Sequence, residues 1–156
     1  MAVVGPGVAS SEELACAEEV GRLLGERGAL IVCGGLGGVM EAACRGAKSA
    51  GATTVGLLPG RDRRDANAHV DVAIPTGLGE ARNALVVRAA DALIAVGGGF
   101  GTLSEIALAL KGGTPVVGIG SWELSRGGQP ERVLLEARDA PEAVELALEL
   151  AARGPR

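Results

Sequence analysis

The stretch ALIAVGGGFGTLSE at residues 92–105 decides the fold of this chain. Its first five residues are apolar and predict a strand that is buried on both faces. Four glycines then fall within residues 97–101, the second glycine loop, and apolar side chains at helical spacing predict a helix that begins near Thr102. Free backbone N–H groups and the positive end of the helix dipole meet at such a junction and favour an anion. We therefore predict a phosphate site at the second glycine loop.

Two known nucleotide-binding motifs do not match this loop. The dinucleotide pattern G-x-G-x-x-G fails because its third glycine is missing, and the chain has no Gly-Lys dipeptide, which a Walker A loop requires. Thr102 and Glu105 have a second interpretation, because Thr-x-x-Glu is also the spacing of a capping box. Capping and ligand contact can coexist, so both interpretations stay open at this point.

Strand and helix patterns alternate along the whole chain. Apolar segments predict strands at residues 2–4, 30–32, 53–58, 71–74, 92–96, 115–119 and 132–137. The segments between them carry helical spacing, with Ser10 or Ser11 and Asp139 as N-caps of the first and last helix. This alternation predicts an α/β protein with a doubly wound parallel sheet, a modified Rossmann fold of about seven strands flanked by helices. We expect residues 1–156 to form one domain.

A further candidate lies at residues 34–38, GGLGG, the first glycine loop. It also follows an apolar strand and opens a helix. In a doubly wound sheet the ligand lies beyond the carboxyl ends of the strands, where the strand order reverses. Two glycine loops that face one crevice suit a ligand with a phosphate and a nucleoside-like body. The charged segment 61–67 leaves another strand end, so it is either a solvated loop or a rim over the ligand.

Composition excludes several classes of function. A net charge of −4 and 1% aromatic residues argue against nucleic acid, which attracts positive charge and stacks on aromatic rings. Cys16, Cys33 and Cys44 are odd in number, and His69 has no cysteine near it in sequence, so we expect no disulfide, no metal and no resident cofactor. No segment approaches the ~18 apolar residues of a membrane helix. We expect a cytoplasmic protein without a membrane partner.

Three segments resemble the Lonely Guy proteins, the cytokinin-activating phosphoribohydrolases long misannotated as lysine decarboxylases. GGLGGVM at residues 34–40 is similar to their G-G-G…G-L-M segment. EARN at residues 80–83 and GGFGTLSE at residues 98–105 are similar to their paired signatures M-x-x-R-K and P-G-G-x-G-T-x-x-E. The resemblance runs from about Val3 to Ile119. It implies hydrolysis of a nucleoside 5′-monophosphate to a free base and ribose 5-phosphate, not lysine decarboxylation.

The resemblance also implies roles for individual residues. Arg82 would contact the ribose phosphate or the reacting sugar, and a guanidinium suits that contact. Glu105 would stabilise the oxocarbenium-like sugar or take a proton during cleavage. The ligand-binding candidates in the similar segments are Gly34, Gly35, Gly38, Met40, Asn83, Gly98, Gly99, Phe100, Gly101 and Thr102. Members of the family are homodimers or larger, so a homo-oligomer is expected here as well.

Three positions depart from the hydrolase signatures. Gly97 stands where the hydrolases have Pro, Asn83 where they have Lys, and Glu41 where they have Gly. Glycine is expected to adopt the turn of that proline at an entropic cost. The resulting pattern is closer to a sister branch with the molybdenum-cofactor carriers, which hold the phosphate of a pterin and are not enzymes.

Three functions therefore remain as alternatives. The first is a phosphoribohydrolase, and the second is a non-catalytic carrier or sensor of a phosphorylated nucleotide or pterin. The third is DNA binding, which a remote kinship with DNA-processing proteins suggests. The acidic balance of the chain and its lack of aromatic residues argue against DNA.

Overall fold

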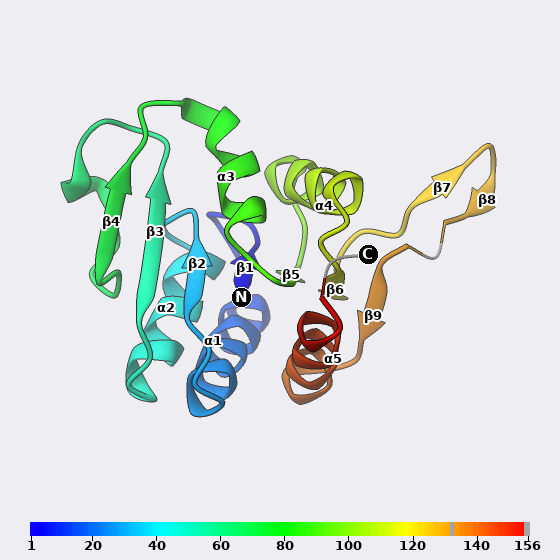
Figure 1. Ribbon diagram of the computed structural model, residues 1–156, viewed down its shortest axis with the longest axis horizontal. Coiled ribbons are helices and arrows are strands. Elements are labelled where there is room, and N and C mark those ends of the chain that lie inside the picture. Colours follow the sequence, from blue (N-terminus) through cyan, green and yellow to red (C-terminus); the bar gives the residue numbers. More distant parts are fainter. Residues whose placement is uncertain (132, 155–156) are drawn as a thin grey trace.

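The computed structural model describes residues 1–131 and 133–154 as an α/β protein (Figure 1). Its main sheet has seven strands, all parallel, in the order β4-β3-β2-β1-β5-β6-β9. These strands are β1 (Ala2–Val4), β2 (Ile31–Cys33), β3 (Thr54–Leu58), β4 (Val72–Pro75), β5 (Leu93–Val96), β6 (Val116–Ile119) and β9 (Leu135–Ala137). The predicted fold class and the seven-stranded parallel sheet are confirmed.

Helices cover both faces of the sheet. The α-helices are α1 (Ser11–Glu26), α2 (Val39–Ser49), α3 (Asn83–Arg88), α4 (Phe100–Gly112) and α5 (Ala140–Ala152). The short 3₁₀ helices are η1 (Arg63–Asp65) and η2 (Gly79–Arg82). Helices α1, α2 and α5 lie on one face, and α3 and α4 lie on the other (Figure 1). Val3 packs toward the first group and its neighbour Val4 toward the second, so β1 is apolar on both faces.

The strand order reverses at β1. Strands β2, β3 and β4 extend to one side of it, and β5, β6 and β9 extend to the other. The first glycine loop follows β2 and the second follows β5, so the two loops leave the strands that flank β1 on either side. This is the place where ligands bind in doubly wound sheets.

Helices α1 and α2 approach each other backbone to backbone. A Cβ added to Gly21 would lie 2.0 Å from the carbonyl oxygen of Ala43, and one added to Gly46 would lie 1.9 Å from that of Glu18. No side chain fits at either position, so the two glycines permit the close approach. They thereby set where α2, and the first glycine loop before it, lies against α1.

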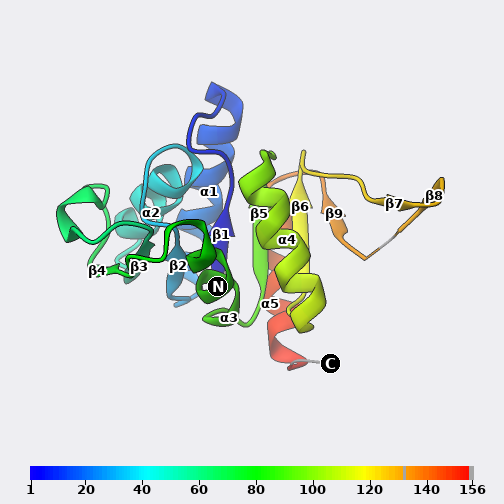
Figure 2. The ribbon, with the colours of Figure 1, turned by 90° about the horizontal axis from the view of Figure 1, so that it is seen from above.

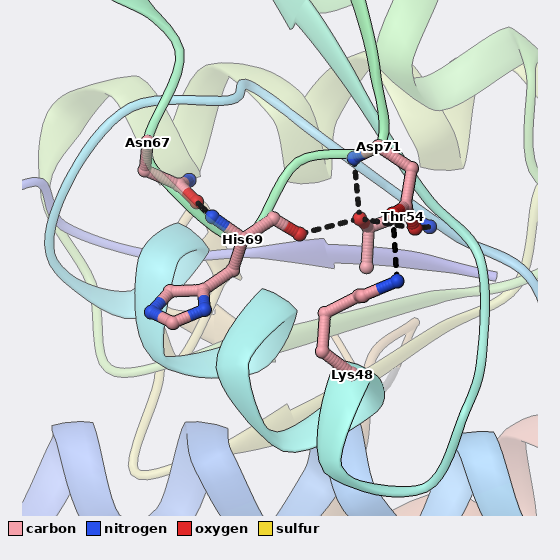
Figure 3. A network of polar contacts seen from close by, with 5 residues as sticks. All are labelled: Lys48, Thr54, Asn67, His69 and Asp71. Atoms are coloured by element: carbon pink, nitrogen blue, oxygen red, sulfur yellow. Dashed lines mark hydrogen bonds and ion pairs between the residues drawn. The ribbon is translucent and has the colours of Figure 1, made fainter.

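The segment between β3 and β4 is anchored at its carboxyl end (Figure 3). The Thr54 hydroxyl donates to the carbonyl oxygen of His69 at 2.6 Å and accepts from the backbone N–H of Asp71 at 3.0 Å. Lys48, on α2, contacts the Asp71 carboxylate at 2.6 Å. The charged segment 61–67 therefore leads into a fixed anchor.

Two elements differ from the expected ones. Helix α4 begins at Phe100 rather than near Thr102. The segment after β6, where no strand was predicted, forms a small antiparallel hairpin of β7 (Ser125–Arg126) and β8 (Gln129–Pro130), which projects from the sheet (Figures 1 and 2). Its two central glycines both have positive φ, as a two-residue hairpin turn requires. Arg132, predicted to start the last strand, lies outside the described residues, and β9 begins at Leu135.

Within the described part of the chain, no helix has the length and apolar character needed to cross a membrane.

Candidate functional site

Arg82 and Glu105 come from different elements and meet in the interior. Arg82 ends η2 directly before α3, and Glu105 lies in the second turn of α4. Arg82 Nη1 is 3.6 Å from Glu105 Oε1, which is an ion pair but too long for a hydrogen bond. Nε and Nη1 of Arg82 are buried and have no hydrogen-bond partner among the described residues. The site therefore holds a buried cation with unused donors.

The pKa of the Glu105 carboxyl lies close to neutral pH. Burial raises its pKa to about 7, although the charge of Arg82 opposes the shift. Near neutral pH the group is therefore present in both its acidic and its basic form. Perturbed carboxyls of this kind concentrate at functional sites.

Thr102 adds a buried hydroxyl that also lacks a partner. Thr102 is only 2% exposed, and its Oγ1 has no hydrogen-bond partner among the described residues. The capping-box interpretation is wrong, because the N-cap of α4 is Gly99 and no side chain caps this end. Thr102 is instead the third residue of the helix. The first-turn N–H groups and this hydroxyl are therefore left without a side-chain cap, and free helix starts of this kind favour anions.

The second glycine loop leaves space on one side and is held on the other. A Cβ added to Gly99 or Gly101 would meet no atom within 4 Å, whereas one added to Gly98 would lie 2.7 Å from Trp122 Nε1. Neither Gly99 nor Gly101 has positive φ, so neither packing nor backbone conformation demands glycine there. Their small size keeps open the approach to the helix start.

Trp122 orients this loop. Its Nε1–H donates to the carbonyl oxygen of Gly99 at 3.2 Å. Because C=O and N–H point in opposite directions in a trans peptide, this bond turns the N–H of Phe100 away from the indole. The Phe100 ring is 83% exposed and packs against Trp122 with the centroids 5.8 Å apart. We did not predict a role for Trp122; its position just after a strand end is the only sequence signal for one.

Gly97 does not adopt the turn of a proline. Its φ is +64°, whereas a proline ring fixes φ near −65°. A Cβ there would also lie 2.0 Å from the Glu13 carboxylate. The expectation that glycine preserves the proline turn is therefore wrong.

The first glycine loop contributes to the site mainly through Gly34. A Cβ added to Gly34 would lie 2.6 Å from Nη1 and Nη2 of Arg82 and 2.7 Å from Sδ of Met40. The guanidinium therefore rests directly on the backbone of this loop. Asn83, next to Arg82 in sequence, is also buried.

Gly35 and Gly38 serve the path of the backbone instead. Both have positive φ, and added Cβ atoms would collide with Leu58 and with Pro6 respectively. The N–H of Val39, at the start of α2, already donates to the carbonyl oxygen of Pro6 at 3.1 Å. The start of α2 is therefore less open to an anion than the start of α4. The structure brings together Gly34, Met40, Arg82 and Glu105, and Thr102 lies one turn before Glu105 on α4.

Comparison with known proteins identifies the family. The model of the SLOG cluster4 family matches residues 1–149. The chain belongs to the SLOG cluster4 family. Over 117 residues, 75% of this chain and 77% of the other, it is 48% identical to an uncharacterised protein of Archaeoglobus fulgidus.

Solved structures similar to this SLOG cluster4 protein include a binding protein and a carrier protein of the molybdenum cofactor. The molybdenum cofactor binding protein of Rippkaea orientalis is similar with a TM-score of 0.86 and 34% identity, over 96% of this chain and 94% of that chain. The molybdenum cofactor carrier protein of Chlamydomonas reinhardtii is similar with a TM-score of 0.85 and 37% identity, over 97% and 96%. The expected similarity to carriers is confirmed, while the Lonely Guy assignment itself stays a prediction.

The same fold occurs in a DNA-binding protein. DNA processing protein A of Helicobacter pylori matches with a TM-score of 0.69 over 95% of this chain and 79% of that chain. At 20% identity this likeness concerns the fold alone. Exclusion of nucleic acid therefore stays a prediction from charge and composition.

Proposed function

We propose that this chain binds a phosphorylated organic cofactor without transforming it, as a carrier or sensor. The phosphate would bind at the start of α4, on the N–H groups of Phe100 and Gly101 and on the Thr102 hydroxyl. Arg82 would supply the positive charge, and the ring system of a pterin or nucleotide would extend from there. The similar proteins of Rippkaea orientalis and Chlamydomonas reinhardtii bind or carry the molybdenum cofactor, which makes a phosphorylated pterin the first ligand to test.

One observation carries the proposal. Arg82 and Thr102 keep buried donors without partners; Thr102 lies in the uncapped first turn of α4, and Arg82 contacts Glu105 in the next turn. A buried polar group without a partner costs about 1–3 kcal/mol, so it requires a reason. A phosphate oxygen would accept from all of these donors and would balance the charge of Arg82.

Replacement of Thr102 tests this site with little risk to the fold. Thr102→Val keeps the shape of the side chain and removes a hydroxyl that has no partner, so stability should be unchanged or increased. Loss of a hydrogen bond to a charged phosphate, about 1.5–3 kcal/mol, should weaken binding roughly 10- to 100-fold. Titration calorimetry with molybdenum cofactor and with nucleoside 5′-monophosphates measures the affinity of each variant. Thr114→Val, just before β6, is the matched control and should bind like the wild type. Equal affinity of Thr102→Val and the wild type would contradict the proposal.

Hydrolysis of the N-glycosidic bond is the second candidate. The observation in its favour is the Glu105 carboxyl, whose pKa is raised to about 7 beside Arg82. Such a group is suited to transfer a proton or to stabilise a positive sugar. The conformation of Gly97, closed to proline, weighs against it because the hydrolase signature has proline there. Hydrolysis is tested by incubating the protein with nucleoside 5′-monophosphates and measuring free base by chromatography. Release of base by the wild type but not by Glu105→Gln would establish the hydrolase.

We also propose that the chain forms a homo-oligomer. Apolar side chains are exposed on the layer of α3 and α4, including Leu85 at 40%, Leu108 at 36% and Phe100 at 83%. Large apolar side chains exposed on one layer favour association when they lie together. Light scattering should give at least twice the mass of the chain, and Leu108→Glu should reduce it to that of a monomer. A monomeric wild type would contradict the proposal.

A further inference from the structure

Two buried thiols face each other beneath the first glycine loop. Cys33 is the last residue of β2, and Cys44 lies in the middle of α2. Their sulfur atoms are 3.5 Å apart, both are free, and neither residue is exposed. No sequence pattern pairs these two residues, which are eleven positions apart. The fold has placed them in contact.

The surroundings make the two thiols unequal. The N–H of Gly35 donates to Cys33 Sγ at 3.3 Å. The Cys44 thiol, this N–H and the charge of Arg82 hold the pKa of the Cys33 thiol below its usual value, while contact with Cys33 and burial raise the pKa of Cys44. Cys33 is therefore the thiol with more thiolate character, and the thiolate is the nucleophile. Cys44 stands as the resolving thiol beside it.

Two partly buried side chains pack against the pair. Leu36 and Val70, both only partly buried, pack over the cluster that contains the two cysteines. Asn67 ties the segment that carries Val70 to the first glycine loop, because its backbone N–H donates to Gly35 and its side-chain amide to Leu36, each at 2.9 Å. Figure 3 shows the same segment near its second anchor at Thr54. Local opening at Asn67 would admit a molecule as small as hydrogen peroxide.

The pair is mechanically connected to Arg82. Gly34 follows Cys33 directly, and a Cβ at Gly34 would lie 2.6 Å from the guanidinium, so the backbone of Gly34 lies close against Arg82. Formation of a disulfide would shorten the sulfur separation from 3.5 Å to about 2.05 Å. Where rotation of the two side chains does not close this gap, the carboxyl end of β2 and the middle of α2 would move toward each other. The first glycine loop, which joins them, would shift against Arg82.

We propose that Cys33 and Cys44 are an oxidation site, whose reversible disulfide displaces Arg82 and lowers the affinity of the phosphate site. The Cys33 thiolate attacks one oxygen of hydrogen peroxide, forms a sulfenic acid and releases hydroxide, which takes up a proton to give water. Cys44 Sγ then attacks Cys33 Sγ, forms the disulfide and expels the second oxygen as water. Two thiols and one peroxide thus give one disulfide and two waters. A dithiol reductant reverses the change.

The first measurement needs no ligand. Native protein treated with peroxide should lose the mass of two hydrogen atoms, and peptide mapping should join Cys33 to Cys44. Cys16→Ala should behave like the wild type, and Cys44→Ala should not form the bond. In NMR spectra the Nε–H resonance of Arg82 should shift in oxidised wild type and return on reduction. Oxidation without this disulfide, or a disulfide that leaves Arg82 unmoved, would overturn the proposal.

The second measurement rests on the proposed function. Phosphorylated pterin should bind the oxidised protein about 5- to 150-fold more weakly than the reduced protein, the range of typical coupling between sites. Equal affinity of both forms would overturn the control of binding. If neither form binds the ligand while the disulfide forms and Arg82 shifts, the proposed function fails and the oxidation site stands.

Discussion

Arg82 Nη1 lies 3.6 Å from Glu105 Oε1, and each of the two side chains is only 9% exposed. An ion pair in such surroundings is costly unless further hydrogen bonds satisfy both groups. Here they do not, because Arg82 retains unpartnered donors and the pKa of Glu105 rises to about 7. Arg82 therefore keeps buried donors that the described residues leave unsatisfied, and in the function proposed above a phosphate would accept from them.

The first prediction concerns pH and stability. The pKa of Glu105 is raised from 4.5 to about 7, so between these values the folded state binds more protons than the unfolded state. The contribution of Glu105 to stability is therefore fully present below pH 4.5 and is lost as pH rises to about 7. The loss amounts to as much as about 3 kcal/mol.

Urea unfolding at several pH values, with Glu105→Gln as the reference, measures this effect. Gln cannot ionise, so the difference between wild type and variant isolates Glu105 from the exposed carboxylates. We expect the wild type to lose stability relative to the variant from pH 5 to pH 8. A difference that stays constant over this range would show that Glu105 titrates normally.

The second prediction separates folding from binding at the second glycine loop. Gly101→Ala places a methyl group where no atom lies within 4 Å, and alanine favours a helix more than glycine does. The melting temperature should be unchanged or rise. Affinity for the phosphorylated ligand should fall at least tenfold, a cost of about 1.4 kcal/mol, because the methyl group fills the approach to the N–H groups. Calorimetry that finds wild-type affinity would place the ligand elsewhere.

The third prediction concerns the contact of Gly34 with Arg82. In Gly34→Ala the new Cβ would lie 2.6 Å from the guanidinium, which is the end of a flexible side chain and can move. Stability should fall only modestly, by about 1–3 kcal/mol as for other overpacked sites. Since Arg82 holds the pKa of Glu105 down, its displacement should raise that pKa further. The pH at which stability falls should then be higher than in the wild type. The same pH in both proteins would show that Gly34 does not position Arg82 against Glu105.

The fourth prediction compares two glycines in helices. By helix propensity alone, Gly21→Ala should stabilise the chain by up to about 1 kcal/mol. In the structure its Cβ would lie 2.0 Å from the carbonyl oxygen of Ala43, so α1 and α2 must separate and stability should fall by several kcal/mol. Gly112→Ala, at the end of α4 with nothing within 4 Å, is the control and should be neutral or stabilising. Equal melting temperatures of the two variants would refute the close packing.

The sequence was most informative where the signal is local. Hydrophobic periodicity and glycine punctuation depend on neighbouring residues, so they predicted the parallel sheet and the two glycine loops. Helix boundaries were predicted less accurately. Helix α4 starts at Phe100 rather than near Thr102, so Thr102 is not its N-cap. The hairpin of β7 and β8 was missed because each strand has only two residues, too few for a periodic pattern.

Sequence by itself determined that this chain is a parallel α/β protein with a glycine loop and a helix start suited to phosphate, and it singled out Arg82 and Glu105 by motif. Only the tertiary structure decided that these two side chains meet, that burial raises the pKa of Glu105, and that Cys33 contacts Cys44. The physical reason is that strand order and helix packing bring together residues that are distant in the chain. Burial, hydrogen-bond satisfaction and pKa are properties of that assembly, and no local pattern encodes them.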